Sequence, residues 1–135
     1  MTIKYLVFSG GGPNGLSQFG AIKKFLENFV DLKNIEGIYA TSIGTILGIL
    51  LSIDADLKDI EDYLINKNWS KSFLQNTNDV LTLNENKGLI NHAFAKEILD
   101  IFYKSKDIDT DITFKNFYEL TGVKLHFYSI KLPDY

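Results

Sequence analysis

Six residues, GGGPNG at positions 10–15, limit the local structure of this chain more than any other segment. The residues before them, 3–9 (IKYLVFS), are rich in β-formers and predict a short buried strand. After them, apolar residues recur in steps of three and four over residues 16–30, which predicts an amphipathic helix. A strand that enters a helix through glycines presents backbone N–H groups to an anion. The segment therefore predicts either an anion-binding turn or a tight turn with close helix packing.

Short apolar segments and amphipathic segments continue to alternate along the rest of the chain. Asp56 is placed to cap one of the helices and Gly122 to end another. Strands that are separated by helices predict a parallel sheet with right-handed crossovers, so we expect an α/β protein with a single domain over residues 1–135. The further strands are expected at 37–41 and 124–132, the helices at 43–53, 56–66, 89–104 and 114–121, and an asparagine-rich loop at 70–87.

The composition excludes several classes of protein. The chain has 14 positive and 17 negative side chains and no arginine, which argues against a nucleic-acid partner. It has no cysteine, so disulfides, thiolate metal sites and cysteine nucleophiles are excluded. The longest apolar stretch, 43–53, is too short to span a membrane, and no targeting segment is visible. We therefore expect a soluble, cytoplasmic protein without a metal or cofactor.

The glycine turn is compatible with three kinds of anion site. Gly10, Gly12 and Gly15 match the dinucleotide motif G-x-G-x-x-G, but the strand at 37–41 lacks the terminal carboxylate that would bind a ribose. A nucleotide phosphate loop would need a lysine where Leu16 stands. An oxyanion hole, in which N–H groups stabilise charge that develops in a transition state, needs no charged partner in the turn.

A second motif, A-T-S-I-G, lies between the strand at 37–41 and the apolar helix at 43–53. It is a near match to G-x-S-x-G, in which a serine on a sharp strand-to-helix turn is exposed above the sheet. Ser42 would be that serine, with the small residues Ala40 and Gly44 on either side; the alternative is that Ser42 only caps the helix. In a parallel sheet both turns would face one crevice, and oxyanion donors beside a serine are the arrangement of acyl transfer.

With these two motifs the sequence resembles the patatin-like phospholipase family over about residues 3–132. The similar segments are LVFSGGGPNG, LSQFGAIKKFLEN, IEGIYATSIGTILGILLS and ITFKNFYELTGVKLHFYSIKL. The resemblance implies a three-layer α/β sandwich with a mainly parallel central sheet flanked by helices. It also implies hydrolysis of carboxylic esters of phospholipids or acylglycerols by a Ser–Asp dyad, at a membrane or lipid-droplet surface and without a metal or cofactor.

The resemblance also implies roles for individual residues. Ser42 would be the nucleophile, and the backbone N–H groups of three glycines would form the oxyanion hole. The oxyanion-hole residues are Gly10, Gly11 and Gly12, and the residues that support the two motifs are Gly15, Ala40 and Gly44.

The sequence departs from the family at two places. Asn14 stands where the family's turn usually has a basic residue, and the chain has no Asp-Gly pair to supply the dyad aspartate. Asp134 lacks that glycine, and the aspartates at 107–111 are expected to be solvated or to cap local structure. We therefore expect the N-terminal part of a patatin-like domain, incomplete at its C-terminus, or a truncated relative. Because a serine hydroxyl is a weak nucleophile without a base, we expect the chain to hydrolyse esters poorly or not at all. The alternative is a catalytically inactive remnant that binds lipid or a protein partner.

Other candidate residues carry weaker signals. His92 and His126 each lack a placed carboxylate, so both are expected to be surface or packed side chains. Trp69, Phe73 and Leu74 are expected to pack in the core, with an acyl pocket or a membrane surface as the alternative.

Overall fold

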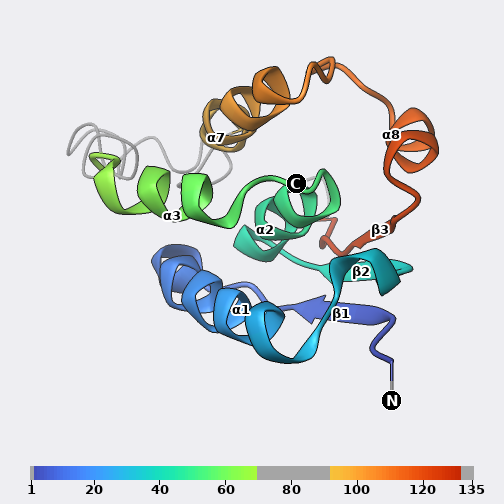
Figure 1. Ribbon diagram of the computed structural model, residues 1–135. Coiled ribbons are helices and arrows are strands. Elements are labelled where there is room, and N and C mark those ends of the chain that lie inside the picture. The colour runs from blue at the N-terminus through green and yellow to red at the C-terminus, as the bar shows by residue number, and fades with distance from the viewer. Residues whose placement is uncertain (1, 70–91, 132–135) are drawn as a thin grey trace.

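The computed structural model describes residues 2–69 and 92–131, and its strands form a parallel sheet in the order β1-β2-β3 (Figure 1). Tyr5 of β1 pairs with Gly37 of β2, which pairs with Lys124 of β3. The α/β class and the parallel sheet predicted from the alternation of segments are thus confirmed. The elements are β1 (Tyr5–Phe8), η1 (Gly12–Asn14), α1 (Gly15–Phe29), η2 (Leu32–Asn34), β2 (Gly37–Ala40), α2 (Ile43–Ser52), α3 (Leu57–Asn66), α7 (His92–Ser105), α8 (Phe114–Thr121) and β3 (Lys124–Phe127).

The third strand is shorter than the predicted strand at 124–132. Its neighbour β2 ends at Ala40, where the chain turns into α2, so the pairing stops one residue beyond β3. The last bond of the ladder is donated by the backbone N–H of Tyr128 to the carbonyl of Ala40 at 3.0 Å. The residues that follow have no neighbouring strand to pair with in the described part of the chain, and Ile130 is 89% exposed.

Helix α2 connects the sheet to the other helices. A Cβ atom added at Gly48 would lie 3.0 Å from Cγ2 of Ile38, so this helix approaches β2 closely. On its other side α2 packs against α7, whose Phe94, Ile98 and Phe102 are buried.

The two faces of the sheet differ in burial. One face is covered by a hydrophobic cluster that includes part of α2, with residues of α1 packed at its margin. The sheet residues buried in this cluster are Leu6, Phe8, Ile38 and Ala40. On the opposite face Val7 is 79% exposed. Within the described residues, helices therefore cover the face of Leu6 and Phe8 and leave the face of Val7 open.

Local signals set the helix ends as the sequence predicted. The carboxylate of Asp56 accepts hydrogen bonds from the backbone N–H groups of Lys58 and Asp59 and so caps α3. Both bonds lower the pKa of Asp56 below its ordinary value, and the bond from Asp59 has the larger effect. Gly122 ends α8 in the left-handed conformation, with φ of 70°.

Candidate active site

Ser42 occupies the sharp turn between β2 and α2. Its φ of 53° and ψ of −129° are unusual for a residue with a Cβ atom. The side chain is exposed and makes no capping hydrogen bond to α2. Instead, the Ser42 carbonyl accepts two hydrogen bonds from Thr45, one from the backbone N–H at 2.9 Å and one from the Thr45 hydroxyl at 2.6 Å. The alternative that Ser42 serves only as a helix cap is therefore wrong, because its hydroxyl is not used for that purpose.

Small residues allow this turn to lie close to the end of β1. A Cβ atom at Gly44 would lie 2.8 Å from Cβ of Phe8 and 2.8 Å from the carbonyl oxygen of Ser9. At the start of α1, a Cβ atom at Gly15 would lie 2.4 Å from Cγ1 of Ile43. Ala40, the small residue before the serine, is 2% exposed at the end of β2. The chain segments on both sides of Ser42 thus pack too tightly for larger side chains at these glycines.

The glycine turn lies beside the serine. A Cβ atom at Gly10 would be 3.2 Å from Cβ of Ser42 and 3.8 Å from its Oγ. Gly11 follows with φ of −170° and ψ of 0°, and Gly12 has a positive φ of 50° and lines a pocket together with Ser42. The structure therefore brings together the two turns that the sequence placed at neighbouring strand ends.

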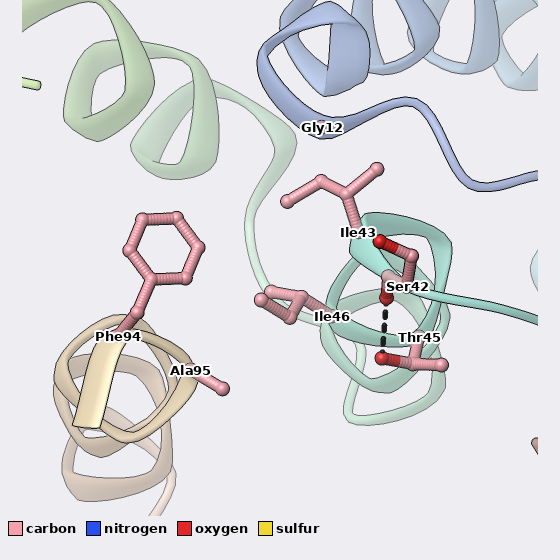
Figure 2. A pocket seen from close by; sticks show the side chains of 7 residues that line it. All are labelled: Gly12, Ser42, Ile43, Thr45, Ile46, Phe94 and Ala95. Carbon is pink, nitrogen blue, oxygen red and sulfur yellow. Dashed lines mark hydrogen bonds between the residues drawn. The ribbon is translucent and has the colours of Figure 1, made fainter. Parts of the chain in front are cut away.

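The pocket at Ser42 has a volume of about 230 Å³ and a largely apolar wall. Figure 2 shows Phe94 extending from α7 toward Ile43 and Ile46 of α2, with Gly12 on the turn above them. The lining residues are Gly12, Ser42, Ile43, Thr45, Ile46, Phe94 and Ala95.

A second apolar cavity of about 200 Å³ shares Gly12, Ile43, Ile46 and Phe94 with the first. Trp69 lines this cavity and also packs against the core, while its indole N–H donates to the Leu64 carbonyl at 2.7 Å. The prediction that Trp69 packs in the core is confirmed, and its position also fits the pocket alternative. Phe73 and Leu74 lie outside the described residues.

No described residue that lines the Ser42 pocket has a carboxylate or an imidazole. His126 is exposed and stacks on Tyr39 at 4.4 Å between ring centroids, which confirms the expected surface position. Asp109 accepts a bond from the backbone N–H of Asp111 at 2.9 Å and so caps local structure, as expected of the acidic loop. Asp134 and the side chain of His92 lie outside the described part. A base for Ser42 is thus absent from the described lining of the pocket.

Sequence reasoning missed one residue, Gln18, that contacts the glycine turn. Its side-chain Nε2 donates to the carbonyl of Ser9 at 3.1 Å and to the Ser9 Oγ at 3.0 Å. The signal was available, because side chains in the first turn of a helix lean toward its N-terminus and so toward the preceding turn.

The fold is an α/β fold in which a serine occupies a strained strand-to-helix turn. A glycine turn lies beside it at the same end of the parallel sheet. The chain belongs to the patatin-like phospholipase family, whose family model matches residues 6–129. It is 27% identical over 112 residues to the uncharacterized protein R571 of Acanthamoeba polyphaga mimivirus, an alignment that covers 83% of this chain and 38% of that protein. No solved structure matches the chain. Among the described helices none has both the length and the apolarity that crossing a membrane requires.

Proposed function

We propose that the chain carries the nucleophile of an acyl hydrolase that cleaves carboxylic esters of phospholipids or acylglycerols. The observation that carries this proposal is the backbone of Ser42, which has a positive φ while its exposed hydroxyl forms no bond to the helix that it precedes. Backbone strain of this kind persists at functional sites, where it holds a side chain in a required position. A serine that served only the helix would adopt an ordinary capping conformation.

In the proposed reaction the Oγ of Ser42 attacks the ester carbonyl. The developing negative charge on the carbonyl oxygen faces the N–H groups of Gly10, Gly11 and Gly12, and the N-terminus of α2 adds a favourable dipole. A base takes the proton from Oγ and passes it to the leaving alcohol as the acyl-serine forms, and water then releases the fatty acid and restores the serine. The apolar cavities lined by Ile46 and Phe94 fit the hydrocarbon chain of such an ester.

The proposal assigns the base to a residue outside the described lining of the pocket. The family resemblance implies an aspartate in an Asp-Gly pair, and these 135 residues contain no such pair. We therefore propose that residues 1–135 form the nucleophile-bearing portion of one α/β domain. Such a portion would react slowly by itself, because the Ser42 proton has no placed acceptor.

Covalent labelling with a fluorophosphonate tests the role of Ser42. We expect an adduct on Ser42 in the wild type and none in Ser42→Ala, with the modified residue located by mass spectrometry. Ser17→Ala is the matched control, because Ser17 is also exposed but lies within α1, and it should label like the wild type. Labelling is expected to be slow, because the Ser42 proton has no placed acceptor among the described residues. A wild type that stays unmodified after prolonged incubation with excess reagent, or an adduct that persists in Ser42→Ala, would refute the assignment.

The second candidate function is a non-catalytic protein that binds lipid or a protein partner. The observation that favours it is the lack of an acid or base among the described residues that line the pocket. It predicts that the chain sediments with phosphatidylcholine vesicles and that Ser42→Ala binds them equally well. Turnover of a short-chain ester that depends on Ser42 would exclude this alternative.

A further inference from the structure

The glycine turn needs support from outside its own backbone. Oxyanion donors stabilise a transition state only when they are held in place before the reaction, whereas glycines lose more conformational freedom on ordering than other residues. Asn14 stands where relatives are expected to have a basic residue, and its side chain makes no hydrogen bond within the described residues. The backbone holds the turn in part, since the N–H of Asn14 donates to the Gly11 carbonyl at 3.0 Å, and a side chain from outside the turn can hold it further.

Gln18 is placed to do so from the first turn of α1. Its Nε2 donates both to the carbonyl and to the hydroxyl oxygen of Ser9, the residue directly before Gly10. The orientation of the amide is defined, because the Ser9 carbonyl can only accept a hydrogen bond. The same nitrogen lies 3.0 Å from the position that a Cβ atom of Gly11 would occupy. The amide thus contacts the turn at both of these residues.

The other end of the amide is unused. Oε1 of Gln18 is buried and has no hydrogen-bond partner among the described residues. The hydrogen bonds of the amide within the described residues are therefore the two that it donates to Ser9.

We propose that Gln18 is a positioning residue, which holds Ser9 and thereby keeps the N–H groups of Gly10, Gly11 and Gly12 beside Ser42. This inference rests on the proposed function, because it assigns the turn to an oxyanion hole. It supplies the support that Asn14 does not give through its side chain. Gln18 acts on the reaction through the turn and need not touch the substrate.

The test uses two variants of Gln18 and one control. Gln18→Met keeps the length of the side chain without its donor, and Gln18→Glu places an acceptor against the Ser9 carbonyl. The control is Asn28→Leu, because Asn28 also donates its amide to a backbone carbonyl of α1, that of Lys24 at 2.7 Å, but at the far end of the helix. Two quantities are measured: the saturable kinetics of fluorophosphonate labelling, and amide hydrogen exchange at Asn14, whose backbone N–H donates to the Gly11 carbonyl at 3.0 Å and so reports on the turn.

In Gln18→Met we expect the maximal labelling rate to fall by about 10- to 100-fold and the half-saturating concentration to change by less than about twofold. Gln18→Glu should fall further, and Asn28→Leu should label like the wild type. Exchange at Asn14 should be faster in both Gln18 variants and unchanged in the control. Unfolding midpoints that fall equally in Gln18→Met and Asn28→Leu would show that the rate effect is not a loss of stability.

The outcomes separate this inference from the proposed function. Full labelling rates in both Gln18 variants, with Ser42→Ala unreactive, would overturn the role of Gln18 alone. If prolonged incubation with excess reagent modifies neither the wild type nor Ser42→Ala, the proposed function fails, and the positioning role for that reaction fails with it. Unchanged exchange at Asn14 in Gln18→Met would show that the amide does not hold the turn, whatever the labelling result.

Discussion

At the scale of the residue, Ser42 combines an unfavourable backbone with an unused hydroxyl. A positive φ in a residue other than glycine costs free energy, and here no capping bond from the side chain offsets that cost. The conformation is maintained by its surroundings, in particular by the two bonds that Thr45 donates to the Ser42 carbonyl. Function and stability therefore favour different residues at position 42.

This conflict can be measured by comparing Ser42→Gly with Ser42→Ala. Glycine adopts the observed φ and ψ readily, so we expect Ser42→Gly to be more stable than Ser42→Ala by about 1–3 kcal/mol in urea unfolding. Ser42→Ala should differ little from the wild type, because the hydroxyl makes no hydrogen bond to the helix. Equal stability of the two variants would mean that the backbone at this position is not strained.

At the scale of the element, close packing positions the N-terminus of α2. Gly44 lets the first turn of the helix contact the end of β1, and Gly48 lets the second turn contact β2. Ser42 is fixed beside the glycine turn because the helix that follows it cannot move away from the sheet without losing these contacts.

We expect Gly44→Ala to destabilise the protein by about 1–3 kcal/mol, because the new methyl group would overlap the backbone of Phe8 and Ser9. The matched control is Gly20→Ala in α1, where a Cβ atom meets nothing within 4 Å. That variant should be more stable than the wild type by about 0.5–1 kcal/mol, since alanine favours the helix. Chemical unfolding of both variants and the wild type measures these changes. If Gly44→Ala is as stable as the wild type, α2 does not pack as closely against the end of β1 as the structure shows.

Elements that depend on local signals were predictable from the sequence, whereas those that depend on neighbours were not. The periodicity of α1, the cap Asp56 and the terminator Gly122 each act over a few residues. The end of β3 depends on where β2 stops, which is a property of the sheet. For Gln18 the sequence indicated a direction, since the side chain leans toward the preceding turn, but not the partner: the bond to Ser9 depends on how the strand end packs. The adjacency of Ser42 and the glycine turn could be predicted because parallel strand ends meet at one edge of a sheet.

At the scale of the whole molecule, one face of the sheet is left open in the described structure. Tyr5 is 55% and Val7 79% exposed on that face, and β1 and β3 are the edges of the described sheet. Exposed apolar sheet surface and free strand edges favour association with other chains. The chain spans 38% of the length of the relative R571, so the surroundings of this face in a longer protein are a separate question.

For the 135-residue chain we expect self-association at micromolar concentration, driven by the open sheet face. Val7→Lys should shift the population toward monomer, because a charged side chain at the most exposed apolar position of β1 opposes burial of that face. Phe29→Lys is the matched control: Phe29 is 73% exposed but lies at the end of α1, and it should associate like the wild type. Sedimentation velocity over a range of concentrations measures the distribution. A wild type that remains monomeric would show that the open face does not drive association, and equal effects of the two lysine variants would trace it to general surface hydrophobicity.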